Sequence, residues 1–160
     1  MTALQPPTQP AKTLYDADYV QWVTTTAEQL RRGDYKAVDW ANLLDEIEDM
    51  ARRERQALMS NLRVLLLHLL KWQYQSEKKT RSWASSIVEH RICIEESLEA
   101  SPSLKPYLDQ EWGKAYVRAV KLALKETGLP KTTFPQDCPF TLIQVMDENF
   151  PSDLDLNAED

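Results

Sequence analysis

The run from Trp40 to Gln75 contains neither glycine nor proline, and this run most constrains what the chain can fold into. Glycine and proline are the residues that most strongly interrupt a helix. Apolar residues recur through the run at the spacing of one helical face. They are Leu44, Ile47, Ala51, Leu58, Leu62, Leu65, Leu69 and Trp72. Asp39 stands directly before the run in the position of an N-cap, so we expect one long helix over residues 40–75, unless it kinks near residues 51–55.

Other segments show the same helical spacing. We expect helices over residues 16–32, 80–100 and 103–127, and a short final helix over 139–149. Gly33 and Gly128 fit the ends of two of them. The chain has only three glycines, too few for the tight turns of an all-β fold or for phosphate-binding loops. The sequence therefore predicts an all-α protein, an antiparallel bundle of four principal helices plus a short C-terminal helix.

The length and the composition of the two ends predict the domain organisation. Residues 14–151 are long enough for a single helical-bundle domain with its own core. Residues 1–13 are rich in Pro, Thr and Gln, and we expect a disordered lead-in there. Residues 152–160 are acidic and lack basic residues, and we expect a disordered tail.

Charge, hydropathy and cysteine content limit the partners and the compartment. The net charge of −6 argues against a broadly basic nucleic-acid binder. The longest uncharged apolar stretch, residues 64–70, is far shorter than the roughly 20 residues that span a bilayer. The two cysteines, Cys93 and Cys138, do not make a disulfide framework, and the N-terminus lacks a signal-peptide core. We expect a cytoplasmic protein without a membrane segment, and the sequence offers no cofactor or metal motif.

A row of polar residues follows the long predicted helix. Glu54, Asn61, His68 and Gln75 are spaced seven apart, so each lies within about 20° of the next. The row borders the apolar side, where an unpaired polar group costs about 1–3 kcal/mol. We therefore expect partners on another helix.

Candidate partners for this polar row follow if the helix expected over residues 80–100 folds back, near residue 78, against the long helix. The reflection places His68 opposite Val88 and Asn61 opposite Glu95, with Arg91 between them. One interpretation is a small buried site formed by Glu54, Asn61, His68, Arg91 and Glu95. The other, which we prefer, is a hydrogen-bonded network that fixes helix register.

Three shorter patterns offer further functional hypotheses. The basic and aromatic segment 71–83 is compatible with single-stranded nucleic acid or with a packed helix turn, which we favour. Cys138 precedes Pro139 at the predicted start of the last helix, where the helix dipole lowers a thiol pKa. Arg63 and His68 resemble the motif of the HEPN superfamily of helical ribonucleases, which implies an RNA-acting site centred on His68. In a regular helix, however, these two side chains point about 140° apart around the helix axis, so they do not share one face.

Several segments, in order along the chain, resemble the domain-of-unknown-function family number twenty-nine, frequent in cyanobacteria. They are "NLLDEIEDMARRE", "LLLHLLKWQYQ", "RSW", "HRICI", "SPSL", "AYVRA", "KETGL" and "FPQDCPFT". The resemblance covers about residues 14–150. It implies a single all-helical domain in a bacterial cytoplasm, but it implies nothing about function and supplies no catalytic or binding residues to carry over.

These observations favour a non-enzymatic helical protein that acts through protein contacts, as an adaptor or a homo-oligomer. Five tryptophans and six tyrosines supply contact anchors if the surface exposes them, for example Trp22, Trp40 or Trp112. The alternative is an RNA-acting enzyme or RNA-binding module of HEPN-like type centred on His68. Solvent access to His68 and the identity of its partner distinguish the two.

Overall fold

The computed structural model describes residues 12–154, and every regular element in that part is helical. The predicted all-α class, with four substantial helices and a short C-terminal one, is confirmed. The chain divides into two compact units at Met50–Ala51, inside the longest helix. The domain boundaries expected from sequence stay a prediction.

The N-terminal unit holds α1 (Leu14–Ala17), α2 (Tyr19–Arg32) and the start of α3 (Trp40–Tyr74). The single helix expected over residues 16–32 is interrupted at Asp18. This residue is extended (φ −153°, ψ 91°), and its carboxylate accepts from the backbone N–H of Gln21 at 2.9 Å. A new N-cap therefore starts α2. Gly33 ends α2 as expected, with φ +74°, a left-handed conformation that glycine adopts without strain.

Helix α3 runs without a break from Trp40 to Tyr74, which confirms the long predicted helix. Asp39 caps it, because its carboxylate accepts from the backbone N–H of Asn42 at 3.3 Å. A 3-10 turn over Ser76–Lys78 follows, and α4 (Arg81–Ala100) begins after the N-cap Thr80. Helix α5 (Leu104–Thr127) ends at Gly128 (φ +68°), as expected from sequence.

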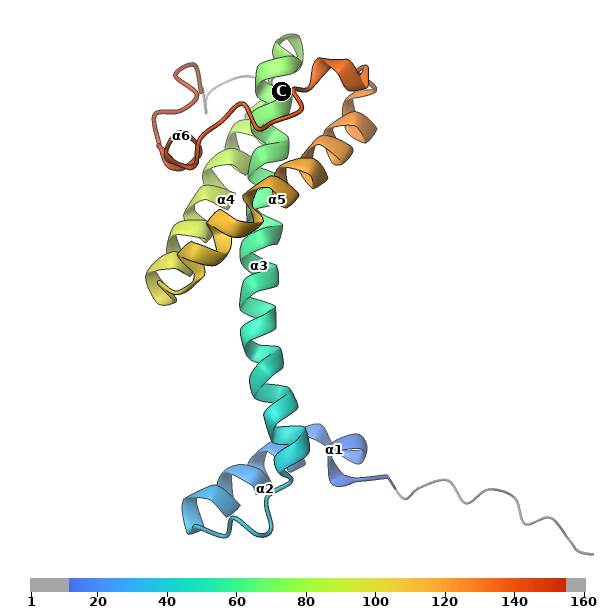
Figure 1. The fold of residues 1–160 in the computed structure, drawn as a ribbon, viewed down its shortest axis with the longest axis vertical. Helices are drawn as coiled ribbons and strands as arrows, with labels where there is room; N and C mark the ends of the chain where they lie inside the picture. The colour runs from blue at the N-terminus through green and yellow to red at the C-terminus, as the bar shows by residue number, and fades with distance from the viewer. Residues whose placement is uncertain (1–11, 155–160) are drawn as a thin grey trace, which may run out of the picture. The chain divides into compact units, whose positions relative to one another are not determined.

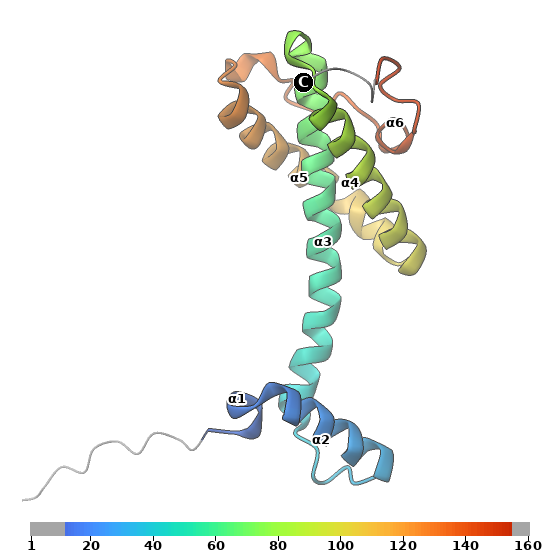
Figure 2. The same cartoon turned by 180° about the vertical axis from the view of Figure 1, so that it is seen from behind.

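In the C-terminal unit, the second half of α3 runs between α4 and α5. Helix α5 passes in front of α3 in Figure 1, and α4 passes in front of it in the reverse view of Figure 2. Helices α4 and α5 diverge from the short turn that joins them. The C-terminal segment, residues 128–154, then returns with α6 (Leu142–Met146) to the side of α4.

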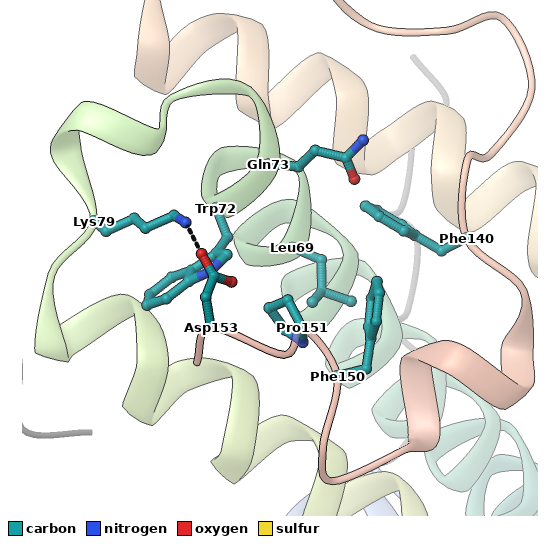
Figure 3. A pocket seen from close by; sticks show the side chains of 8 residues that line it. All are labelled: Leu69, Trp72, Gln73, Lys79, Phe140, Phe150, Pro151 and Asp153. Carbon is teal, nitrogen blue, oxygen red and sulfur yellow. Dashed lines mark hydrogen bonds and ion pairs between the residues drawn. The ribbon is translucent and has the colours of Figure 1, made fainter. Parts of the chain in front are cut away.

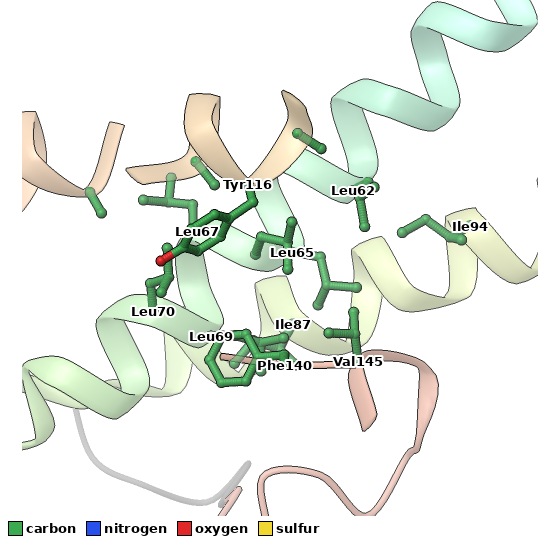
Figure 4. Packing of buried hydrophobic residues seen from close by; sticks show 14 of the residues in the cluster. Leu62, Leu65, Leu67, Leu69, Leu70, Ile87, Ile94, Tyr116, Phe140 and Val145 are labelled. Atoms are coloured by element: carbon green, nitrogen blue, oxygen red, sulfur yellow. The ribbon is translucent and has the colours of Figure 1, made fainter. Parts of the chain in front are cut away.

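A continuous apolar core joins these elements (Figure 4). Leu58, Leu62, Leu65, Leu66, Leu69 and Leu70 of α3 are almost completely buried, as are Ile87 and Ile94 of α4, Leu108 of α5 and Val145 of α6. Burying each such side chain contributes about 1.5–3 kcal/mol to folding. The C-terminal segment contributes to this core, because Phe140 and Val145 pack against the same leucines.

The C-terminal segment differs from the sequence expectation in two ways. The last helix is shorter than residues 139–149, because Thr141 rather than Pro139 caps it through a capping box with Gln144. Asp153, expected in a disordered tail, is bonded to Trp72 and Lys79. The rest of that tail and residues 1–11 of the lead-in lie outside the described residues. Among residues 12–154, no helix has the length and apolar character needed to cross a membrane.

Candidate functional site

The polar row on α3 divides into exposed and paired residues. Glu54 is exposed, whereas Gln75 is buried. Asn61 Oδ1 accepts a hydrogen bond from His90 Nδ1 of α4 at 2.8 Å. Sequence reasoning does not single out His90, because the simple reflection about residue 78 places Glu95 opposite Asn61. The 3-10 turn over Ser76–Lys78 lies at the point assumed for a sharp reversal.

His68 bonds to its own helix rather than to another one. Its Nδ1–H donates to the carbonyl of Val64 at 2.9 Å, since a carbonyl can only accept. Burial is the main cause that lowers the pKa of His68, and Lys71 and His90 lower it further. The Val64 carbonyl and Glu126 act in the opposite direction. The imidazole is therefore held neutral at neutral pH.

This lowered pKa predicts a pH-dependent loss of stability. The unfolded chain takes up a proton at His68 near the ordinary pKa of 6.5, before the folded chain does. The free energy of unfolding should therefore fall as the pH drops through about 6.5. Urea unfolding at about pH 7.5 and about pH 5.5 should show a smaller difference for His68→Gln than for the wild type. An equal difference in the two proteins would contradict the assignment of this pH dependence to His68.

Arg91 is buried and bonds to the C-terminal segment, not to His68. Its Nε donates to the carbonyl of Val145 and one terminal nitrogen donates to that of Phe150, both at 2.8 Å. Burial lowers its pKa, and the carboxylates of Glu95, Asp147 and Glu148 oppose that shift. Arg91 thus holds α6 and the residues after it against α4. Neither of these two bonds involves His68.

The bonds and charge contacts join the five candidate site residues only in part. The structure brings Glu95 near Arg91, leaves Glu54 exposed, and pairs Asn61 with His90. The HEPN-like pair is not joined either, because Arg63 bonds to Ser60 at 3.2 Å and His68 to Val64. Within residues 12–154, no group of three or more His, Cys, Asp or Glu side chains is arranged to hold a metal ion.

A pocket of about 260 Å³ lies beside α3 under the end of the C-terminal segment (Figure 3). Leu69, Phe140, Phe150 and Pro151 form its apolar walls, and Trp72, Gln73, Lys79 and Asp153 complete it. Asp153 accepts from Trp72 Nε1 at 2.9 Å and from Lys79 Nζ, which lowers its pKa, chiefly through the Lys79 bond. Three of the four polar lining residues, Trp72, Lys79 and Asp153, are thus bonded to one another.

The basic and aromatic segment 71–83 is likewise bonded within the chain. Lys71 pairs with Glu126 at 2.8 Å and lies 4.2 Å from the centre of the Trp83 ring. Lys79 lies 4.9 Å from the centre of the Trp72 ring. Each of these cation–π contacts occupies one face of its indole ring, a face that a nucleic-acid base would need for stacking. The geometry favours the packed helix turn.

An aromatic cluster organises the N-terminal unit. Tyr15 and Tyr19 both donate to Glu46, at 2.6 and 2.9 Å, which raises the pKa of Tyr15 to about 12. Their rings pack on Trp22, whose centroid lies 4.8 Å from that of Tyr15. Trp22 and Val38 are the buried apolar residues of this unit within the described part. The unit's internal core is therefore small.

Most of the exposed large apolar side chains lie in this same unit. Of thirteen in residues 12–154, ten fall before Ala51. Seven of them form what we call the N-terminal apolar face: Val20, Val23 and Leu30 of α2, and Trp40, Leu44, Ile47 and Met50 of α3. At 100° per residue, the α2 members lie within an arc of about 80° and the α3 members within about 120°. Exposed apolar stripes of this kind on neighbouring segments of the chain are typical of a protein interface.

Comparison with protein families identifies the chain. The model of the family described as Domain of unknown function DUF29 matches residues 14–151. The chain belongs to the DUF29 family. The match confirms the resemblance seen in the sequence, and it includes every helix from α1 to α6. No curated protein and no solved structure matched the chain.

Within the DUF29 region, Cys138 is half-buried and lies outside any helix. The prediction that it directly precedes a helix start is wrong, because α6 begins only at Leu142. Burial raises the pKa of its thiol, against smaller opposing effects of the Phe140 backbone and the Trp112 side chain. A thiol that stays protonated at neutral pH is a weak nucleophile.

Proposed function

We propose that this DUF29 protein acts through protein contacts rather than by catalysis, and that a second copy covers the N-terminal apolar face. The observation that carries the proposal is the exposure of that face: Val20 is 73 % exposed, Met50 62 % and Ile47 53 %. Each apolar Å² removed from water contributes about 25 cal/mol. Association would recover stabilisation that the small core of this unit does not provide.

Charges at the edges of the face support a second copy as the occupant. Viewed down the axis of α2, Arg31 lies about 20° from Val20, just outside the arc of exposed apolar residues. It is on the edge of that arc farther from the buried Trp22. Viewed down the axis of α3, Glu48 lies about 40° from Leu44, just outside the arc of exposed apolar residues and on the edge opposite to Glu46. A two-fold axis between copies would pack α2 of one against α3 of the other. Arg31 would then flank Glu48 of the second copy with opposite charge.

The cytoplasm is the compartment that fits this proposal. Both cysteines are free thiols, as is usual in a reducing compartment.

Hydrogen–deuterium exchange of the wild-type chain at low and high protein concentration tests the location of the contact. Amides in residues 19–32 and 40–50 should exchange more slowly at high concentration, because association protects them. Those of α4 and α5 should not change, which provides an internal control. Protection confined to residues 51–154, or none at any concentration, would contradict the proposal.

A further inference from the structure

A second apolar surface lies on the C-terminal unit, between the end of α4, the start of α5, and α6. It is a groove of about 450 Å³, within the range of about 300–1,000 Å³ typical of binding pockets. Leu98, Leu142, Ile143 and Met146 supply its apolar lining, and Glu95, Glu99 and Lys105 its charged rim. None of the residues of the N-terminal apolar face contributes to it.

The short helix α6 explains why an apolar residue is exposed here. Val145 is fully buried in the core, and Ile143, two residues earlier, lies about 200° away around the helix. Ile143 is consequently 84 % exposed, the highest fraction among the large apolar residues exposed in residues 12–154. Beside it, the unbranched Met146 can adapt to different side chains. The groove thus presents apolar surface that the fold itself does not use.

The surroundings of the groove are strongly acidic. Glu95, Glu96 and Glu99 lie on the last turns of α4, and Asp147 and Glu148 directly follow α6. The C-terminal end of α4 carries a negative partial charge and the start of α5 a positive one, so the excess of acidic side chains sets the sign of the local charge. Lys105 is the only basic residue that lines the groove among the described residues. An occupant should therefore be positively charged.

We propose that this groove binds a basic, apolar segment of a partner protein. Apolar side chains of the segment would pack on Ile143 and Met146, while its Lys or Arg side chains face Glu95 and Glu99. This site is distinct from the self-association proposed above, and it gives an oligomeric DUF29 protein a second, heterologous binding surface.

Selection of random peptides displayed on phage, with the full-length chain as bait, tests the groove. Selected peptides should combine aliphatic or aromatic residues with net positive charge. Measured by fluorescence anisotropy, their binding should weaken at least about ten-fold in Ile143→Asp. It should also weaken in Glu95→Lys/Glu99→Lys and as salt is raised, because exposed charge pairs are screened.

The controls separate this site from the N-terminal face. Ile143→Asp should keep the melting temperature and the oligomeric state of the wild type, because Ile143 is almost fully exposed. Leu44→Asp/Ile47→Asp, altered in the other unit, should bind the peptides with unchanged affinity. The groove proposal is overturned if no peptides are enriched, if the enriched peptides are acidic or uncharged, or if Ile143→Asp binds them like the wild type.

Discussion

Replacement of Arg91 by alanine should lower the free energy of unfolding by about 3 kcal/mol or more and loosen the C-terminal segment. The guanidinium makes two charge-assisted hydrogen bonds, to the carbonyls of Val145 and Phe150. Such bonds contribute about 1.5–3 kcal/mol each. Val145 lies in the last turn of α6, where a carbonyl has no partner inside its own helix. Alanine leaves both carbonyls without this donor and removes a buried side chain.

Thermal unfolding and exchange measurements check this prediction. For a chain of this size, about 3 kcal/mol corresponds to a melting temperature roughly 6–12 °C lower. Amides of residues 140–154 should exchange faster than in the wild type. Arg91→Lys keeps the charge but not the two-pronged geometry, so its stability should be intermediate. Arg118→Ala, at an exposed position on α5, should melt like the wild type. Wild-type melting of Arg91→Ala would show that the two bonds are unimportant.

The helices could be predicted from the sequence because their signals are local. Each signal acts within a few residues of the chain. The signals are the absence of Gly and Pro over residues 40–75, the cap at Asp39, and the glycines after α2 and α5. The errors also had local causes. Asp18 and Thr141 are capping residues inside segments whose apolar spacing suggested a longer helix.

The candidate site was less predictable because its contacts depend on distant segments. Arg91 bonds to carbonyls that lie 54 and 59 residues later in the chain, and nothing in a helical repeat indicates them. Asn61 pairs with His90 in a register that a simple reflection of helices does not give. Periodicity also cannot separate core from interface. Leu44 and Ile47 continue the same apolar row as Leu58 and Leu62, yet only the latter two are buried.

The double substitution Leu44→Asp/Ile47→Asp should abolish self-association while leaving the fold intact. Both side chains are more than half exposed in the single chain, so aspartate should disturb the folding of the unit little. In the proposed complex the same positions are covered. Carboxylates would have to lose their hydration there without a partner. We expect the dissociation constant to rise at least about 100-fold, equivalent to about 2.7 kcal/mol.

A matched control distinguishes the face from apolar exposure in general. Val117 on α5 is 51 % exposed, close to Leu44 at 55 % and Ile47 at 53 %. Val117→Asp should therefore associate like the wild type. All three proteins should have the same helical circular dichroism, so that a loss of association cannot be assigned to unfolding.

Sedimentation equilibrium of the wild-type chain beside these variants is the most direct test of the account. The wild type and Val117→Asp should approach twice the 18.5 kDa chain mass as concentration rises. Leu44→Asp/Ile47→Asp should remain at the mass of one chain. A wild-type chain that stays monomeric throughout, or a double variant that associates as tightly as the wild type, would contradict self-association through the N-terminal apolar face.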